Sequence, residues 1–451
     1  MLKLQAAEDT IVAIATPPGR GAVALIRISG PQAFAIGRQI LDPWPDEARH
    51  AVLCTVRHNA DVLDRAVVVL FEKPASFTGE DTVEISTHGG QLVPMAVVSA
   101  MIALGARQAR PGEFTQRAVL NGKLDILQAE AVADLVDARS TGMHRAALAQ
   151  LDGGLSRRLS RLRDQLLELE ALIAYYVDFP EEDDGPIPRA RIEYSANEVT
   201  VALKSLLATA ASGELIREGA LVVIAGSPNV GKSSLFNAVL GRSRAIVTDI
   251  PGTTRDALEA VVDCGVWPIR LVDTAGLRST DDELERLGIE VSERYLADAE
   301  IVLACGETAM GIKETVHAIM SKTQAVIIPV RTKADLVAEG DQRSRSALAV
   351  SAITGAGVRE LLGAVNRVIS DQHGTLSTEQ PILTRARHRE AISSACREAD
   401  LFLEVWRRET LPATIAGVHV RTAISYLEEL IGAVGIEDIL DRVFSSFCVG
   451  K

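Results

Sequence analysis

Cysteine is scarce in this 451-residue sequence, and the spacing of its five cysteines excludes two common uses. They lie at positions 54, 264, 305, 396 and 448, an odd number without the close pairs that zinc sites need. We therefore expect neither a disulfide framework nor a zinc site, and a reducing compartment is the natural setting. No apolar run approaches the ~18 residues of a membrane span, and MLKLQAAEDT lacks the layout of a secretion signal. These absences predict a cytoplasmic protein that does not enter a membrane.

Positive charge is also in short supply, because 47 Lys and Arg face 60 Asp and Glu and the net charge is −13. This argues against a strongly basic nucleic-acid binder. It does not exclude RNA, because local patches matter more than totals. What is present is the composition of a globular protein, 47% hydrophobic and 24% charged, long enough for about two to four domains.

The pattern of strands and helices changes along the chain and predicts four segments. Residues 1–120 alternate strand-like stretches, such as AVALIRIS and TVEIS, with helical ones, which indicates an α+β domain. Residues 121–214 and 374–451 are helical, and 215–373 alternate strands and helices as in a doubly wound α/β domain. Because neither helical block has strands of its own, we expect the two blocks to pack together, with the α/β domain inserted between them.

A phosphate-binding loop is the strongest motif in the chain. In LVVIAGSPNVGKSSLFNAVL, an apolar strand runs into a loop of the form G-x-x-x-x-G-K-[ST] and then into a helix. The loop amides and the helix N-terminus favour bound phosphates. Lys232 is expected to reach the β- and γ-phosphates, and the Ser233 hydroxyl to bind Mg²⁺. The stretch therefore predicts a nucleoside triphosphate site.

The elements that follow favour guanine as the base. Thr254 in GTTRD supplies a second hydroxyl for Mg²⁺, and LVDTAG ends a strand with the carboxylate of Asp273. Asp335 in TKAD can accept two hydrogen bonds from guanine N1 and N2, and adenine would leave that carboxylate unpaired. Guanine-binding loops of this type begin with Asn, whereas this one begins with Thr332. We expect weaker guanine affinity at this position but unchanged specificity.

The residues for hydrolysis are less plain. The position that holds a water-orienting Gln in Ras-like GTPases is Leu277, which cannot hydrogen-bond to water. The stretch STDDELERLGIE offers candidates for a catalytic carboxylate at Asp281, Asp282, Glu283 and Glu285; the alternative is that acidic residues here favour the first turn of a helix. The side-chain carbonyl of Asn229 could bind a monovalent cation beside the phosphates, together with backbone carbonyls of TDIPGTT.

These motifs, with DTIVAIATPPGRGAVALIRISG, SFTGEDTVEISTHGG and the C-terminal FCVGK, resemble the MnmE (TrmE) family of tRNA-modifying GTPases over essentially the whole chain. The resemblance implies an N-terminal α+β folate-binding domain, an interrupted helical domain and an inserted Ras-like P-loop G domain. It also implies a homodimer formed through the N-terminal domains, G domains that meet on GTP binding, and activation by K⁺. With MnmG (GidA), a flavoprotein, the family modifies wobble uridine (U34) of tRNA at C5 from a tetrahydrofolate one-carbon donor.

The resemblance also implies roles for individual residues. The domains are predicted as 1–120 for folate binding and dimerisation, 121–214 and 374–451 for the helical domain, and 215–373 for the G domain. Lys232 and Glu285 are the predicted catalytic residues of the G domain, and Ser233 and Thr254 bind Mg²⁺. The K⁺ site comprises Asn229, Thr248, Ile250 and Thr253. GTP is bound by Asn229, Val230, Gly231, Lys232, Ser233, Ser234, Thr248, Thr253, Thr254, Asp273, Thr274, Ala275, Gly276, Thr332, Lys333, Asp335, Ser351 and Ala352.

The folate, as a 5-formyl or 5,10-methylene tetrahydrofolate, is expected at Arg27, Glu84, Lys123 and Lys451. A glutamate can pair with the amino-pyrimidine edge of the pterin, while Arg and Lys neutralise carboxylates. Cys448 is a candidate catalytic residue there, although the sequence identifies no base beside it, and a packing role is the alternative. Gly450 and Lys451 exclude a prenylation box at this terminus.

Two other functions fit parts of the sequence. A switch-type GTPase acting on ribosomal RNA or a protein effector would need the G domain alone. A helical scaffold whose G domain controls dimerisation would need no folate site. FCVGK and the N-terminal motifs favour a modification enzyme over these two functions, because neither a switch nor a scaffold needs these motifs.

Overall fold

The computed structural model describes residues 9–179, 187–242, 258–265, 267–273, 293–336, 347–374, 381–432 and 450. The chain divides into two compact units. One unit comprises Met1–Ala133 with Glu428–Lys451, and the other comprises Asp134–Leu427. Each has a core of its own, so the two are described separately.

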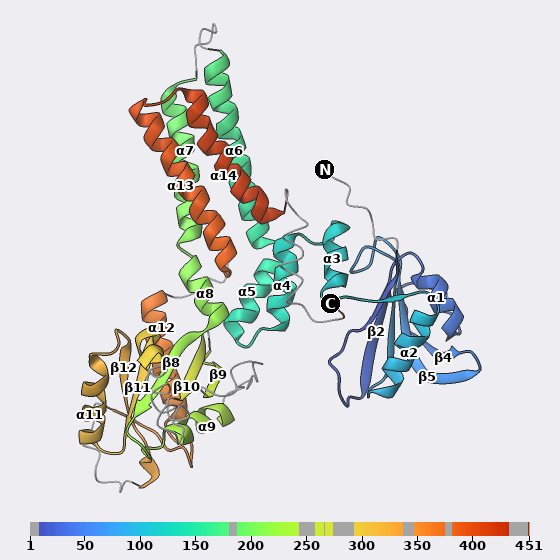
Figure 1. The fold of residues 1–451 in the computed structure, drawn as a ribbon, viewed down its shortest axis with the longest axis horizontal. Helices are drawn as coiled ribbons and strands as arrows, with labels where there is room; N and C mark the ends of the chain where they lie inside the picture. The colour runs from blue at the N-terminus through green and yellow to red at the C-terminus, as the bar shows by residue number, and fades with distance from the viewer. Residues whose placement is uncertain are drawn as a thin grey trace, which may run out of the picture. The chain divides into compact units, whose positions relative to one another are not determined.

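The first unit contains a seven-stranded sheet of order β3-β4-β5-β6-β2-β1-β7. Neighbouring strands pair antiparallel, except that β1 and β7 are parallel. Two helices, α1 (Ala33–Ile40) and α2 (Leu92–Ala103), pack on one face of the sheet around a shared core (Figure 1). The strands are β1 Ile11–Ile14, β2 Val23–Ser29, β3 Leu41–Asp42, β4 Val52–His58, β5 Asp61–Phe71, β6 Thr82–His88 and β7 Arg107–Gln108.

Strand β2 shows why this sheet has two different faces. Its sequence VALIRIS places Ala24, Ile26 and Ile28 in the core beneath α1 and α2. Because side chains alternate along a strand, Arg27 lies on the opposite face. On that face Arg27 lies 5.6 Å from the ring centre of Phe114 in α3 (Glu113–Leu120), and α4 (Ile126–Val136) follows along the chain. The predicted α+β fold of this part is confirmed.

The second unit combines helices with a six-stranded sheet of order β13-β12-β11-β8-β10-β9, in which β9 is antiparallel to β10 and the other pairs are parallel. The near-continuous apolar runs of β8 and β11 suit strands buried on both faces. The strands are β8 Ala220–Gly226, β9 Leu258–Asp263, β10 Pro268–Asp273, β11 Ile301–Gly306, β12 Val326–Arg331 and β13 Leu348–Ala349. The elements around them are α9 Lys232–Arg242, α11 Ala309–Met320, the 3₁₀ turn η2 Ala334–Leu336 and α12 Val358–His373.

Long helices from both sides of this sheet domain pack together in the same unit (Figure 1). Lys204 on α7 pairs with Asp400 on α13, and Arg421 on α14 pairs with Glu170 on α6. The leucine stripe of α6 is buried along its length. The bounds are α5 Thr141–Leu151, α6 Gly154–Asp178, α7 Arg189–Leu207, α8 Ala210–Glu218, α13 Ala386–Arg408 and α14 Ala413–Ile431. The interrupted helical domain and the P-loop domain of the predicted fold class are confirmed, whereas the exact domain boundaries stay predictions.

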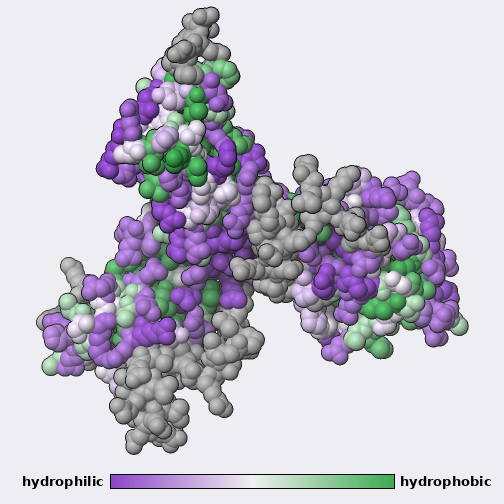
Figure 2. All heavy atoms as spheres, turned by 45° about the horizontal axis from the view of Figure 1, so that its top comes forward, coloured by the Kyte–Doolittle hydropathy of each residue, from purple (hydrophilic) through white to green (hydrophobic). Residues whose placement is uncertain are grey.

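One helical stretch of the described residues, Arg189–Glu218, is long and apolar enough to cross a bilayer by length and composition. Its apolar residues Ile192, Val199 and Leu203 are buried in the bundle, which accounts for its hydropathy without a membrane. Tyr194 and Val201 lie on its outer side and are 63% and 66% exposed. Figure 2 shows apolar side chains of this kind scattered among polar ones on the helical part of the surface.

A carboxylate marks the place where the sheet domain joins the helices. Asp134 accepts a 2.6 Å hydrogen bond from Arg385, which precedes α13, and lies 3.7 Å from Arg217 in the last turn of α8. The chain segments that enter and leave the sheet domain are thereby held to the same residue. Backbone packing is close there as well, since a Cβ at Gly213 would lie 2.0 Å from the carbonyl oxygen of Leu383.

Candidate functional site

The phosphate loop lies between β8 and α9 at the carboxyl edge of the sheet, as its sequence predicts. A Cβ at Gly226 would lie 2.5 Å from the Cys305 carbonyl oxygen on the adjacent strand β11, so the turn needs glycine. Lys232, which begins α9, donates hydrogen bonds of 2.9 Å to the carbonyl oxygens of Gly226 and Ser227. Its ammonium group is thus held over the loop and is almost fully buried.

A hydroxyl and a carboxylate meet beside this loop. The Ser233 hydroxyl donates a 2.5 Å hydrogen bond to Oδ2 of Asp273, which is fully buried at the end of β10. Strand β10 pairs with β8 in parallel, with Asp273 opposite Ile224, and this register brings the carboxylate to the loop. Hard oxygen donors of this kind fit Mg²⁺.

A second loop, which follows β12, holds the predicted base-binding residues. Ser351 is buried after β13, and its hydroxyl donates a 2.5 Å hydrogen bond to Oδ1 of Asp335 in η2. That bond orients the carboxylate while its other oxygen stays available to a ligand. Lys333 has a left-handed backbone with φ 52°, and its ammonium forms an ion pair with Glu307. A sequence reading alone missed Glu307, because it has no motif and lies 26 residues away from its partner.

Thr332 differs from the prediction made for it. Its hydroxyl donates a 2.6 Å hydrogen bond to the carbonyl oxygen of Val230 inside the phosphate loop. We expected weaker guanine binding because Asn, which helps to join the two loops, is missing here. The structure shows that the threonine joins them, so this reason for weaker binding does not hold.

Three further predicted residues are placed by the structure, and the others lie outside the described residues. Asn229 is exposed and has a left-handed backbone with φ 62°, Ser234 is exposed on α9, and Ala352 is half-buried. The remaining predicted residues of this site, together with the C-terminal candidates Cys448 and Lys451, lie outside the described residues. For the G domain these are Thr248, Ile250, Thr253, Thr254, Thr274, Ala275, Gly276 and Glu285.

In the first unit, the structure brings Arg27 and Glu84 together. They face each other across β2 and β6, and two nitrogens of Arg27 contact Oε1 of Glu84 at 2.7 and 2.9 Å. The guanidinium lies 5.5 and 5.6 Å from the ring centres of Phe77 and Phe114. Both charged side chains keep about a fifth of their surface exposed, 18% and 23%. The two aromatic rings are part of this pair's surroundings, and no sequence pattern predicts them there.

Lys123 lies beside the loop that carries Phe77. Its ammonium donates a 3.0 Å hydrogen bond to the carbonyl oxygen of Pro74, and Asn121 donates to that of Thr78. The loop at 74–79 therefore contacts Lys123 through Pro74 and Arg27 through Phe77.

The described C-terminal residue, Gly450, packs on the same unit. It is buried, its φ is 98°, and a Cβ there would lie 2.5 Å from the carbonyl oxygen of Ile14. Strand β1 pairs with β2 so that Ile14 lies opposite Ile26 and Ala13 opposite Arg27. The residue before Lys451 is therefore seated at the end of the strand that neighbours Arg27.

A buried ionic network supports this unit. Arg117 donates to the carboxylates of Asp9, Glu80 and Glu113, and its side chain is 3% exposed. Burial tends to raise the pKa of Glu113. Hydrogen bonds from Arg107 and the Arg110 amide, with the charges of Arg107 and Arg117, nevertheless lower the pKa overall. Burial also tends to raise the pKa of Asp9. The hydrogen bonds and charges of Arg107 and Arg117 outweigh burial, so the pKa of Asp9 is lowered.

The described cysteines are not activated thiols. Cys54, Cys264, Cys305 and Cys396 are free and buried. Burial raises the pKa of Cys264 and of Cys305 to about 12. A thiol with so high a pKa carries almost no thiolate near neutral pH, and the thiolate is the nucleophile.

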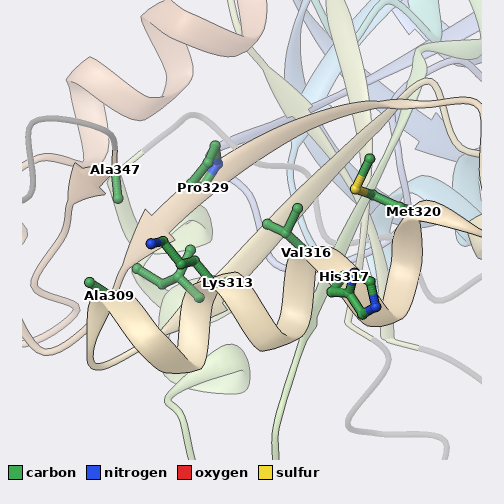
Figure 3. A pocket seen from close by; sticks show the side chains of 8 residues that line it. Ala309, Lys313, Val316, His317, Met320, Pro329 and Ala347 are labelled. Atoms are coloured by element: carbon green, nitrogen blue, oxygen red, sulfur yellow. The ribbon is translucent and has the colours of Figure 1, made fainter.

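Two cavities lie away from the predicted residues. One of about 320 Å³ is lined by Lys313, Val316, His317 and Met320 of α11 together with Pro329 of β12 and Ala347 (Figure 3). The other, of about 460 Å³ in the first unit, lies between the loop at 16–21 and the start of α2, and it adjoins Ile14. Neither is lined by a residue of the predicted sites.

The family models and the curated relatives agree on one family. The profile of the MnmE helical domain matches residues 126–448, and that of the GTP-binding protein TrmE N-terminus matches residues 10–123. The tRNA modification GTPase MnmE of Moorella thermoacetica is 39% identical over 98% of this chain and 100% of that protein. The protein of the same name from Synechococcus sp. (strain RCC307) is 41% identical over 100% of both chains. Among solved structures, the G domain of the T. maritima FeoB iron transporter is 25% identical and covers 33% of this chain and 98% of its own, with a TM-score of 0.26.

Proposed function

The chain belongs to the MnmE family of tRNA modification GTPases, and from this premise we propose that it hydrolyses GTP and, together with MnmG, modifies C5 of wobble uridine (U34) in certain tRNAs. The product is a cmnm⁵ or nm⁵ uridine. The observation that carries the GTP part is the arrangement of two loops at one sheet edge. Ser233 meets Asp273 at the phosphate loop, and Ser351 orients Asp335 at the base loop.

Each described residue has a distinct task in this reaction. Lys232, held by two loop carbonyls, would move to the β- and γ-phosphates once they are present. Ser233 and Thr254 would hold Mg²⁺, with Asp273 behind the Ser233 hydroxyl. When bound, Mg²⁺ neutralises charge on the phosphate oxygens. Asp335 would accept hydrogen bonds from guanine, and a base lacking those donors would leave the carboxylate unpaired.

Hydrolysis needs a group that orients water and a charge that stabilises the transition state. Leu277 cannot orient water, so we assign this role to Glu285. We assign the stabilising positive charge to K⁺, bound by Asn229, Thr248, Ile250 and Thr253. The exposed position of Asn229 in the phosphate loop supports this assignment, because its amide is accessible beside the phosphates.

The modification site would lie in the N-terminal unit. Both Arg27 contacts use Oε1 of Glu84, so the second carboxylate oxygen can accept from the amino-pyrimidine edge of a tetrahydrofolate. Lys123 and Lys451 would neutralise the carboxylates of the folate tail, and the buried seat of Gly450 supports the part given to Lys451. The folate, as the 5-formyl or 5,10-methylene form, supplies one carbon, and the flavin of MnmG supplies redox chemistry. We further propose a cytoplasmic homodimer that assembles with MnmG.

Reconstitution tests this proposal. The purified chain should hydrolyse GTP in preference to ATP, and faster in KCl than in NaCl. With MnmG and its flavin, GTP, tRNA, glycine or ammonium as the amine donor, and tetrahydrofolate labelled at its 5,10-methylene carbon, it should transfer the label to tRNA. Equal rates of GTP hydrolysis in KCl and NaCl would contradict the K⁺ assignment. Unlabelled tRNA would contradict the proposed modification.

A further inference from the structure

A carboxylate and an imidazole meet at the end of β6 in the N-terminal unit. Nδ1 of His88, the last residue of β6, lies 2.8 Å from Oδ1 of Asp64 on β5. The backbone amide of His88 donates a 2.8 Å hydrogen bond to Oδ2 of the same carboxylate. The side chain of Asp64 is 10% exposed, whereas that of His88 is 74% exposed. A nearly buried carboxylate therefore holds an imidazole ring that lies open to solvent.

The carboxylate also decides which ring nitrogen carries the proton. Burial tends to raise the pKa of Asp64, but hydrogen bonds from the His88 amide, the His88 ring and the Arg65 amide lower this pKa overall. An ionised carboxylate can only accept, so in the neutral imidazole Nδ1 carries the proton and Nε2 keeps its lone pair. No residue in the described part of the chain is hydrogen-bonded to Nε2. This nitrogen is therefore a base that points away from its own carboxylate.

His88 lies on the same face of the sheet as the Arg27–Glu84 pair. Side chains alternate along a strand, and on β6 the residues between Glu84, Ser86 and His88 are buried, whereas these three are accessible. On β2, Arg27 lies opposite Glu84 and Val23 lies opposite His88. Four residues of an extended strand span about 13 Å. The imidazole and the proposed folate contact therefore lie on one open face, at the two ends of one strand.

The cavity of about 460 Å³ in this unit adjoins the imidazole along the chain. It is lined by Val23, which is opposite His88, and by Gly90, two residues further along. Arg20 of the loop between β1 and β2 and Met95 of α2 also line it. A guanidinium can pair with a phosphate, and an apolar side chain can pack on the face of an unstacked base. The cavity beside His88 thus suits a nucleotide of an RNA.

We propose that His88, held in place by Asp64, is the base that accepts the C5 proton of the wobble uridine during its modification. This inference rests on the proposed function and adds a residue to it. Any substitution at C5 replaces a C–H bond with a C–C bond, so one proton must leave whichever amine is the donor. His88 is then a catalytic residue, and Asp64 is a positioning residue that acts through the imidazole.

The proton transfer balances without a further oxidant or reductant. The electron pair of the C5–C6 double bond forms the new bond to the one-carbon unit, and the nitrogen that carried this carbon takes up the displaced pair. The C5–H bond then breaks, its electron pair restores the double bond, and its proton passes to Nε2 of His88. Asp64 stabilises the imidazolium that results.

The first test removes Nε2 and keeps the contact with Asp64. In His88→Asn the side-chain amide nitrogen takes the place of Nδ1 as the donor. Release of tritium from tRNA that carries [5-³H]uridine, measured in the reconstituted reaction with MnmG, should fall by ~10²–10⁴-fold. GTP hydrolysis, tetrahydrofolate binding and the melting temperature should stay as in the parent chain, because none of them uses Nε2.

A matched control is His50, an exposed imidazole whose Nδ1 lies 3.4 Å from a carboxylate oxygen of Glu47. The carboxylate of this second pair is 78% exposed, so water competes for it and the ring is not held. His50→Asn should release tritium at the rate of the parent chain.

The second test needs neither folate, MnmG nor turnover. In ¹⁵N NMR spectra at about pH 8, where an ordinary imidazole is neutral, His88 of the parent chain should carry its proton on Nδ1. The signal is assigned by its loss in His88→Asn. Asp64→Asn should move the proton to Nε2, because the new amide can donate to Nδ1, and tritium release should fall by ~10²-fold. A contact that only stabilised the strand end would not link the tautomer to the rate.

Two results would overturn the inference while leaving the proposed function in place. One is tritium release by His88→Asn at the rate of the parent chain. The other is a proton on Nε2 in the parent chain, which also decides the matter if His88→Asn does not fold. If the parent chain itself neither modifies tRNA nor releases tritium, the proposed function fails and the inference fails with it.

Discussion

The nucleotide site and the N-terminal candidate site bring charged groups together in different ways. In the nucleotide site, Lys232 and Asp273 are buried and bonded to the backbone carbonyls of a loop and to a hydroxyl. In the N-terminal site, Arg27 and Glu84 are bonded to each other and keep part of their surface exposed. The first is a cradle built by backbone, and the second is a pair of side chains across two strands.

This difference indicates how each site would meet its ligand. Loop amides and a fixed lysine suit phosphates, whose charge is the same in every nucleotide, so selectivity must come from the separate base loop. A partly exposed ion pair suits a ligand that adds a contact to one partner, here the second oxygen of Glu84. A ligand at the N-terminal site therefore interacts with a pair that is already satisfied, and its net gain is smaller.

The largest expected effect concerns the base loop. Asp335→Asn should lower the preference for guanine over xanthine nucleotides by ~10⁴-fold, because the amide donates where guanine also donates. Competition between GDP and xanthosine diphosphate measures it. Asp371→Asn, at an exposed position on α12, is the matched control and should change nothing. A variant at Asp335 that still rejects xanthosine nucleotides would count against the proposed base contact.

A smaller effect is expected at the N-terminal pair. Glu84→Gln keeps the shape but removes the charge, and tetrahydrofolate affinity should fall by ~10–100-fold, the range for a hydrogen bond to a charged group. Fluorescence titration measures it, with Glu72→Gln, at an exposed position directly after β5, as a control. GTP hydrolysis should be unaffected by either change. Unaltered folate binding by Glu84→Gln would remove this pair from the site.

The packing of Gly450 against Ile14 predicts an effect of intermediate size on folate affinity. Gly450→Ala places a Cβ against the Ile14 carbonyl at a left-handed backbone, so the last residues must move. Folate affinity should fall about tenfold, the size expected from 1–2 kcal/mol of backbone strain. Gly374→Ala, which also has a positive φ but open space around it, tests whether strain alone has this effect on folate binding. Equal folate affinity in Gly450→Ala and the parent chain would separate the tail from the site.

The smallest effect concerns acid stability of the N-terminal unit. The pKa of Glu113 is lowered from 4.5 and that of Asp9 from 3.8. Their contribution to the free energy of unfolding is therefore complete above these values and is lost as pH falls through the lowered pKa. Hydrogen exchange at 107–120, corrected for intrinsic rates, should lose protection below pH 4.5. Glu113→Gln should flatten this dependence, whereas Glu47→Gln, at an exposed position, should preserve it.

Sequence predicts the two regions unequally, for physical reasons. The phosphate loop is contiguous, and parallel strands place Asp273 and Asp335 at the same edge, so motif order was enough to gather them. The Arg27–Glu84 contact depends on the register of β2 and β6, which sequence does not show, and the two residues were predicted only from the family resemblance. The Lys333–Glu307 pair and the rings of Phe77 and Phe114 had no signal, because a single charged or aromatic residue reads as surface or core. The hydrogen bond from Thr332 to Val230 had no signal either, because it depends on how the loop is held by the backbone bond to Gly306.

Mass spectrometry of tRNA from cells lacking this protein tests the central claim most directly. The account predicts that C5 modification of wobble uridine disappears and returns with the intact chain, but not with Asp335→Asn or Glu84→Gln. Intact C5 modification in the cells without the protein would contradict it.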